Sequence, residues 1–244
     1  MTGAAKRPTG LAVKRDVAQR KERASYGARR EEIVKAAGLV LKQHGLSGTT
    51  IEAIAKEAGV DRATIYYYFA DKEALYQAVL DQVFGGVREA IHHALSRPLP
   101  PRERLIAYVC AHYDYIASNP LYPRIVHAEF LRAGRDASRL QRIAKEYFRP
   151  VFTDVAALLA EGMETGEFRA VNPVHFIPSM VSVIVFYFTT AAPIMAVMTG
   201  GDPMSPERLA ERRAAVVDFI TSALFLPDSA KQAQRTRHEK GRGK

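Results

Sequence analysis

Residues 49–75, TTIEAIAKEAGVDRATIYYYFADKEAL, constrain the fold of this chain most, because they encode two short helices separated by one glycine. Ala55, Gly59 and Ile65 lie four and then six residues apart. Ala55 is small where the second helix must cross closely, Gly59 can adopt the positive φ of a sharp turn, and Ile65 closes the small core. This spacing predicts a helix-turn-helix.

Polar residues mark the helix starts around this turn. Thr49 and Glu52 have the spacing of a capping box, and Asp61 and Asp71 are placed to cap the next two helices. Upstream, apolar residues recur at helical spacing and stop at Gly45, so a packing helix precedes the pair. We therefore expect a three-helix domain.

The second helix of the pair is where DNA bases would be read. Arg62 can reach guanine or phosphate, whereas Ala63 and the methyl group of Thr64 can contact thymine methyl groups. Tyr67 can hydrogen-bond a phosphate, and Lys72 begins the next helix, where backbone amides also favour anions. The alternative is that the three consecutive tyrosines only pack the helix. Three neighbours cannot share one helix face, so at least one is exposed.

The formal net charge of +9 over 244 residues is concentrated at the two ends. Residues 1–30 carry nine Lys/Arg and two Asp/Glu, and residues 228–244 carry six and two. Polar, like-charged ends of this kind are usually disordered, and their simplest role is to keep the protein soluble. Next to a DNA-binding domain, the first of them can also follow phosphates or enter a minor groove.

The rest of the chain is predicted to be helical, with helices near 102–118, 120–133, 136–165, 174–198 and 206–226 and no alternating strand pattern. The fold class is therefore all-α. We expect a basic, disordered arm over residues 1–28, a helix-turn-helix domain over 29–75, a larger helical domain over 76–227 and a basic, disordered tail over 228–244. The single cysteine, Cys110, suits a reducing cytoplasm, and the basic start lacks the apolar run of a signal peptide.

Residues 170–201 contain no Asp, Glu, Lys or Arg, which raises the question of a membrane span. Three prolines and several hydroxyl residues make this segment a poor lipid-facing helix. A helix that is apolar all round is otherwise buried in a core or between subunits. We expect no association with a membrane.

Aromatic and methionine side chains are concentrated between residues 108 and 188. Most of them would fill the core of any helical bundle, but a small-molecule site has the same apolar and aromatic composition with a few polar anchors. The candidate residues for binding an apolar or aromatic small molecule are Tyr108, His112, Tyr115, His127, Phe130, Phe152, Phe176 and Met180.

Sequence signatures of catalysis are not found. The chain has no phosphate loop, dinucleotide fingerprint, His-Glu-x-x-His or G-x-S-x-G. The pairs His92–His93 and His112–Asp114 do not face one another on a helix, so we expect no metal, no cofactor and no enzyme. Two alternatives to a sequence-specific DNA-binding protein remain. One is an enzyme in which the helix-turn-helix is only structural, and the other is a sequence-nonspecific DNA-binding protein that acts through its basic ends.

The motif at residues 49–75 resembles the DNA-binding domain of the tetracycline-repressor (TetR) family of bacterial regulators, and the resemblance covers about residues 30–75. The resemblance implies an all-helical homodimer, a C-terminal domain that binds a small-molecule effector, and repression as the default. It implies DNA contacts from Thr50, Arg62, Ala63, Thr64, Tyr66, Tyr67 and Lys72.

Two positions depart from the commoner family pattern, because Asp61 and Tyr68 stand where serine and histidine are frequent. Asp61 keeps the helix cap but puts a phosphate contact at that position in doubt. Family members of this kind pair through their last two helices, here with Leu209, Val216, Val217, Ile220, Leu224 and Phe225 on the final one. A two-fold dimer of this kind implies a palindromic double-stranded DNA operator.

Overall fold

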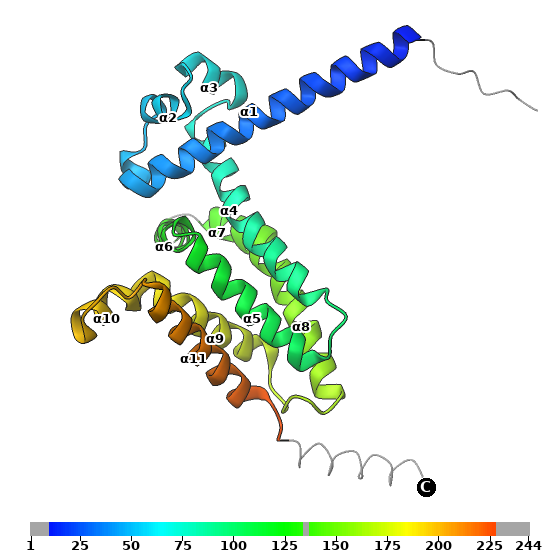
Figure 1. Cartoon of the computed structure of the whole chain (residues 1–244), viewed down its shortest axis with the longest axis vertical. Coiled ribbons are helices and arrows are strands. Elements are labelled where there is room, and N and C mark those ends of the chain that lie inside the picture. Colours follow the sequence, from blue (N-terminus) through cyan, green and yellow to red (C-terminus); the bar gives the residue numbers. More distant parts are fainter. Residues whose placement is uncertain (1–9, 134–136, 228–244) are drawn as a thin grey trace, which may run out of the picture. The chain divides into compact units, whose positions relative to one another are not determined.

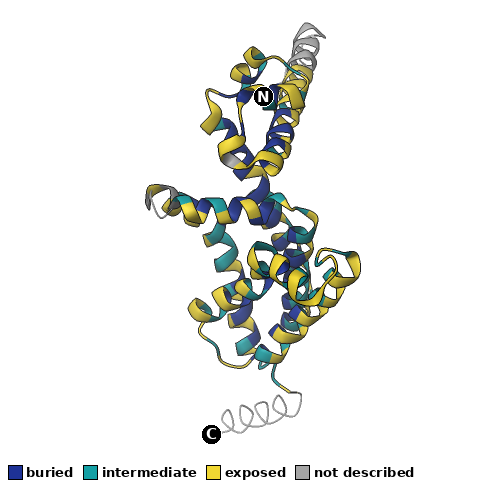
Figure 2. Cartoon of the chain, turned by 90° about the vertical axis from the view of Figure 1, so that its left-hand side faces the viewer, coloured by how far each residue is buried: buried dark blue, intermediate teal, exposed yellow. Residues whose placement is uncertain are grey.

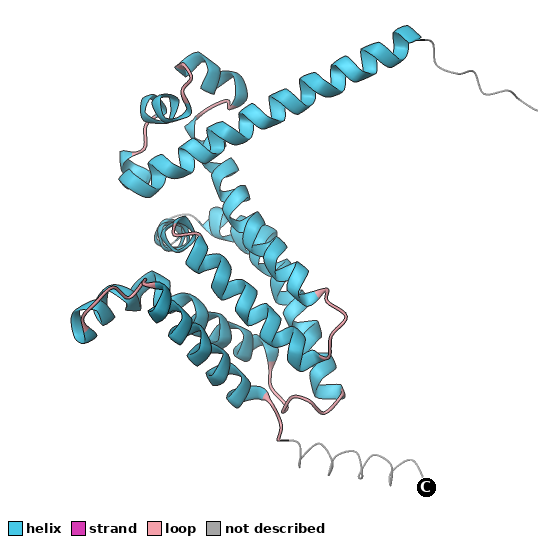
Figure 3. Cartoon of the chain, viewed as in Figure 1, coloured by secondary structure: helices cyan, strands magenta, loops and turns pink. Residues whose placement is uncertain are grey.

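The computed structural model describes residues 10–133 and 137–227. Within these ranges the chain is helical and contains no strand, only a bridge between Phe168 and Phe225 (Figure 3). The predicted all-α fold class is confirmed. The chain divides between Asp81 and Gln82 into two compact units, here called the N-terminal and C-terminal units. This division falls six residues after the predicted one, because the first turns of α4 (Lys72–Leu95) belong to the N-terminal unit.

The N-terminal unit consists of α1 (Gly10–Gly48), α2 (Ile51–Ala58), α3 (Arg62–Tyr68) and the start of α4 (Figure 1). Its buried side chains come from every helix and include Ile33, Ala37, Val40, Ile54, Ala55, Ile65, Leu75 and Val79. In each unit the buried residues gather along the inward faces of the helices (Figure 2). The predicted stop of the first helix is visible as a break at Gly45, which has a φ of 65°.

The prediction of a disordered arm over residues 1–28 is wrong for residues 10–28, which extend α1. These residues contain no proline and are rich in Ala, Arg and Lys, which favour helices. They also continue a helix that tertiary packing has already formed, so no new nucleation is needed. Residues 1–9 of the predicted arm and the predicted tail at 228–244 lie outside the described residues.

Helix caps in the N-terminal unit follow the predictions with one correction. Thr50, and not Thr49, caps α2, since its Oγ1 accepts a hydrogen bond from the Ala53 amide at 3.1 Å. The Thr49 hydroxyl instead donates to the Gly45 carbonyl at 2.7 Å, across the break in α1. Asp61 and Asp71 cap α3 and α4 as predicted.

The C-terminal unit contains the rest of α4 and the helices that follow it. They are α5 (Pro101–Ser118), α6 (Leu121–Ala133), α7 (Ala137–Ile143), α8 (Arg149–Glu164), α9 (Pro173–Phe186), α10 (Ala192–Thr199) and α11 (Pro206–Leu224). Two short π-helical segments, η1 (Ala144–Phe148) and η2 (Tyr187–Ala191), join α7 to α8 and α9 to α10. Each precedes a proline, Pro150 or Pro193, whose missing N–H interrupts the regular hydrogen-bond ladder.

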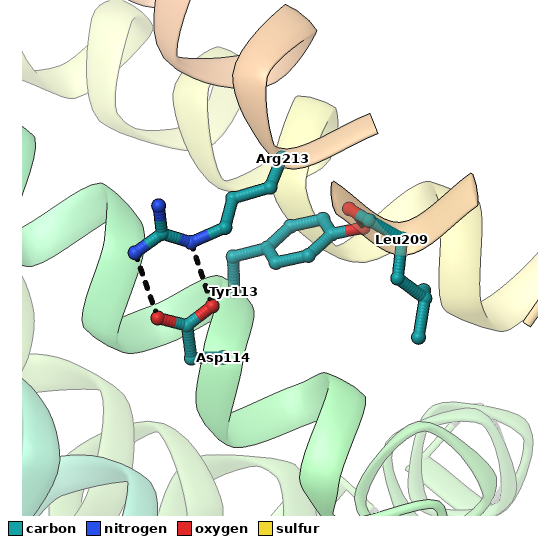
Figure 4. Close-up of polar contacts among 4 residues, drawn as sticks. All are labelled: Tyr113, Asp114, Leu209 and Arg213. Atoms are coloured by element: carbon teal, nitrogen blue, oxygen red, sulfur yellow. Dashed lines mark hydrogen bonds and ion pairs between the residues drawn. The ribbon is translucent and has the colours of Figure 1, made fainter. Parts of the chain in front are cut away.

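Polar contacts fix α11 against α5 (Figure 4). The Tyr113 hydroxyl donates to the Leu209 carbonyl at 2.9 Å, and the Arg213 guanidinium makes two hydrogen bonds to the Asp114 carboxylate at 2.7 and 2.9 Å. Val216, Ile220 and Leu224 of α11 are buried inside their own chain.

Candidate DNA-binding surface and ligand cavity

The helix α3 is held by one buried side chain and presents most of the others to solvent. Ile65 is fully buried, whereas Arg62, Ala63 and Tyr66 are exposed and Thr64 is half-buried. The Tyr67 side chain is 71% exposed, which is a large fraction for an aromatic residue in a folded protein. The helix therefore offers a row of side chains to a partner.

The turn before α3 has the geometry that the sequence predicts. Gly59 ends α2 in the left-handed region, with φ 62° and ψ 36°. Asp61 accepts a hydrogen bond from the Thr64 amide at 2.6 Å, and hydrogen bonds from Thr64 lower the pKa of the Asp61 carboxyl below its ordinary value. Arg62 pairs with Glu52 of α2 at 2.9 Å. The start of α3 is thus fixed before any DNA arrives.

The other two predicted DNA contacts also lie at helix starts. Thr50 is exposed at the first turn of α2, and Lys72 is exposed at the first turn of α4. Both positions bring an amide-rich helix terminus together with a polar or cationic side chain, which is suited to a phosphate.

Tyr26 is a neighbour of α3 that the sequence analysis missed. Its ring centroid lies 4.6 Å from that of Tyr68 and 5.9 Å from that of Tyr67, and the rings of Tyr67 and Tyr68 are 5.1 Å apart. Tyr26 lies in the segment that was predicted to be disordered, so no contact with α3 was expected from it. An uninterrupted helical composition from residue 10 onward was the available signal.

A cavity of about 550 Å³ lies within the C-terminal unit. Side chains from α4, α5, α6, η1, α8, α9 and η2 line it: Phe84, Val87, Ile91, Tyr108, His112, Tyr122, Val126, His127, Phe130, Tyr147, Phe148, Val151, Phe152, Ile177, Pro178, Val181, Ser182, Val185, Phe186 and Thr189. This volume is typical of a site for a small organic molecule.

Five of the eight predicted ligand residues line this cavity, namely Tyr108, His112, His127, Phe130 and Phe152. The other three do not. Tyr115 donates its hydroxyl to the Val83 carbonyl at 2.8 Å and packs where a side chain at residue 86 would stand. Met180 is buried, and Phe176 is half-buried, away from the cavity walls.

The cavity has a buried end and an open end. Tyr108 and His112 are buried, whereas Phe130 and Phe186 are more than half exposed. Among the described residues, no Asp, Glu, Lys or Arg side chain lines it. Burial lowers the pKa of His112 to about 4, so its ring is neutral at physiological pH. The cavity suits an uncharged, mostly apolar ligand.

The polar groups at the buried end of the cavity have few hydrogen-bond partners. The Tyr108 hydroxyl lies 3.5 Å from His112 Nδ1, and within the described ranges His112 Nε2 has no hydrogen-bond partner. A ligand with one uncharged polar group would find possible partners here. No group of three or more His, Cys, Asp or Glu side chains that could hold a metal occurs in the described part of the chain.

An apolar segment remains exposed on the C-terminal unit. Residues Pro173–Thr199 are long and apolar enough to cross a membrane, and 22% of their most apolar stretch is buried inside the chain. The large exposed side chains of this segment and of α11 are Val174, Phe186, Ile194, Val197, Met198 and Phe219. An exposed apolar surface of this kind is typical of an interaction site.

Two family models match the chain. "Bacterial regulatory proteins, tetR family" matches residues 31–79, and "Tetracyclin repressor-like, C-terminal domain" matches residues 101–220. The chain belongs to the TetR family. It is accordingly a DNA-binding transcriptional regulator, with the helix-turn-helix in the first matched region and the cavity lined largely by the second.

Similar proteins extend over most of this TetR-family chain. The HTH-type transcriptional regulator RutR of Escherichia coli K12 is 28% identical over 72% of the chain and 81% of its own length. The HTH-type transcriptional repressor KstR2 of Mycolicibacterium smegmatis is 26% identical over 78% and 89%. The structure of the ketosteroid transcriptional regulator KstR2 of Mycobacterium tuberculosis shares the fold, with a TM-score of 0.65 and 18% identity over 82% and 96%.

Proposed function

We propose that this TetR-family protein is a cytoplasmic repressor that binds a palindromic operator as a homodimer and is released by a small apolar or aromatic effector. The observation that carries the proposal is the exposed row on α3, held by Ile65 and capped by Asp61. The DNA contacts are assigned to Thr50, Arg62, Ala63, Thr64, Tyr66, Tyr67 and Lys72.

The homodimer is supported by the exposed apolar side chains of α9, α10 and α11. The α11 residues expected at this interface need revision, because Val216, Ile220 and Leu224 are buried within their own chain. Phe219 is 60% exposed and is the better candidate on that helix. A second copy would cover these apolar groups, and two copies would present two α3 helices to one palindrome.

The effector is supported by the cavity in the C-terminal unit. The α4 residues Phe84, Val87 and Ile91 line the cavity, and the same helix begins at Lys72, a proposed DNA contact. A ligand that binds one conformation of this helix better than another would shift the population toward it and change operator affinity. Release therefore requires that the ligand prefer the conformation that binds DNA poorly.

Fluorescence anisotropy tests the proposed function. The purified protein is titrated into DNA from upstream of its own coding sequence and into a scrambled duplex, each at two salt concentrations. Preference for one sequence that persists at the higher salt supports specific recognition. Equal, salt-sensitive binding to the scrambled duplex and to genomic fragments selected by the protein would identify a nonspecific DNA-binding protein instead.

The same duplex then reports effector action. Small molecules are screened for loss of anisotropy, and each active compound is repeated with Val181→Trp, which fills part of the cavity. A compound that acts through the cavity loses its effect on this variant while operator affinity in its absence stays unchanged. Release that is equal for both proteins would place the effector site elsewhere.

A further inference from the structure

A groove on the N-terminal unit joins α1 to the end of α3. It is lined by Lys21, Glu22, Ser25, Tyr26, Tyr67 and Tyr68. The α1 part of this lining lies in the segment that was expected to be disordered, and it falls outside the DNA contacts assigned above. The groove therefore needs an explanation of its own.

The tyrosines in the groove form one aromatic cluster. Tyr26 lies nearly against Tyr68, with ring centroids 4.6 Å apart, and meets the ring of Tyr67 at 5.9 Å with an interplanar angle of 70°. Tyr67 and Tyr68 are themselves edge to face at 5.1 Å. Aromatic pairs at these separations attract one another. The Tyr67 ring is thus supported on two sides although most of its surface is open to solvent.

Support of this kind matters for a residue that contacts a ligand. A free tyrosine side chain loses rotamer freedom when it binds, whereas a ring already held in place loses less. Tyr26 can therefore raise DNA affinity without touching DNA. Lys21 and Ser25 stand one helical turn apart on α1, so they share a face and bring an ammonium and a hydroxyl to the same groove.

We propose that this groove is a binding site for a phosphate of the DNA backbone, in which Tyr26 positions Tyr67 and Lys21 and Ser25 contact the phosphate. The proposal rests on the proposed function, since it adds to the same DNA-binding surface. Glu22 is the one acidic side chain in the lining and lies beside Lys21 in sequence. A lysine, a serine hydroxyl and tyrosine hydroxyls are all common partners of DNA phosphates.

A double-mutant cycle tests the positioning role of Tyr26. DNA affinity is measured for wild type, Tyr26→Ala, Tyr67→Ala and the double variant, on selected and on scrambled duplexes. Tyr26→Ala is expected to weaken binding about threefold when Tyr67 is present and not at all when residue 67 is alanine. Tyr26→Phe keeps the ring contact and should restore wild-type affinity. Thermal melting confirms that each variant is folded.

Salt dependence tests the phosphate contact. Lys21→Ala is expected to reduce the slope of log affinity against log salt by about one, equally on both duplexes. Lys145→Ala removes the same charge from an exposed position in the C-terminal unit and should leave the slope unchanged.

Additive effects of Tyr26→Ala and Tyr67→Ala would overturn the positioning role, and equal slopes for Lys21→Ala and Lys145→Ala would overturn the phosphate site. Because phosphate contacts do not depend on sequence, both results are readable on scrambled DNA. If the wild type shows no preference for the selected duplex over the scrambled duplex, that result would count against the proposed function alone.

Discussion

The two units of this protein carry their candidate sites in opposite ways. The N-terminal unit presents exposed side chains from one short helix, whose position depends on Ile65, a glycine turn and an aspartate cap. The C-terminal unit contains a cavity whose walls, among the described residues, come from five α-helices and two π-helical segments. Local sequence determines the first kind of site, whereas the second emerges only from packing. Mutations should therefore separate binding from stability in the N-terminal unit more cleanly than in the C-terminal unit.

Ile65→Ala is expected to have the largest effect and to test whether one buried residue holds α3. Removal of a fully buried isoleucine side chain should lower the local free energy of unfolding by about 3 kcal/mol. Native-state hydrogen exchange of the α3 amides measures this. Tyr66→Ala, a truncation of a side chain that is 47% exposed, is the matched control. Equal losses in the two variants would contradict the assignment of Ile65 as the anchor.

Acid denaturation tests whether His112 is buried and neutral in the cavity wall. The unfolded chain protonates His112 near pH 6.5, but burial lowers the pKa in the folded protein to about 4. The stability due to keeping this ring neutral is present above pH 6.5 and falls as the pH approaches 4. Between pH 7 and 5 the wild type should lose about 2 kcal/mol more than His112→Phe. Urea denaturation at both pH values measures the difference, and parallel losses would refute the buried, neutral assignment.

Tyr67→Ala should separate binding from stability. Loss of a DNA contact by an exposed residue is expected to weaken operator binding about tenfold with only a small change in thermal melting, due to its ring contacts with Tyr26 and Tyr68. Anisotropy with the operator measures the affinity. Unchanged affinity would mean that the exposed face of α3 has been placed wrongly on the DNA, and a large loss of stability would remove the contrast between the two units.

Arg213→Gln should have the smallest effect. The Arg213–Asp114 pair in Figure 4 is bidentate but partly exposed, with side-chain accessibilities of 40% and 53%, so its loss should cost less than about 1 kcal/mol. Tyr113→Phe removes a hydrogen bond from a buried ring and is expected to cost about 1 kcal/mol. Urea denaturation of both variants ranks them. A larger loss for Arg213→Gln would show that surface charge, rather than burial, fixes α11.

The sequence predicted the turn and most helix caps of the N-terminal unit well because their determinants are local. Gly59, Asp61 and Asp71 act within three or four residues of their positions, and all three have their predicted roles. Thr50 replaced Thr49 as the cap because side-chain direction at a helix start depends on backbone geometry that two adjacent threonines do not reveal.

The cavity could be predicted only in part. Aromatic enrichment identified Tyr108, His112 and Phe152, but the walls also include Phe84 and Ile91 of α4, which meet them only through tertiary packing. The periodicity of α11 likewise showed an apolar face without showing that its own chain covers it. Tyr26 was missed because its contacts with α3 lie about 40 residues away in sequence.

Hydroxyl-radical footprinting on genomic fragments selected by the full-length protein tests whether α3 of each subunit reads one half of a symmetric operator. We expect two protected half-sites related by two-fold sequence symmetry and centred about one helical turn or more apart. Tyr67→Ala should weaken both half-sites equally. Diffuse protection with no preferred sequence, or one protected half-site without a symmetric partner, would contradict the binding of two α3 helices to a symmetric operator.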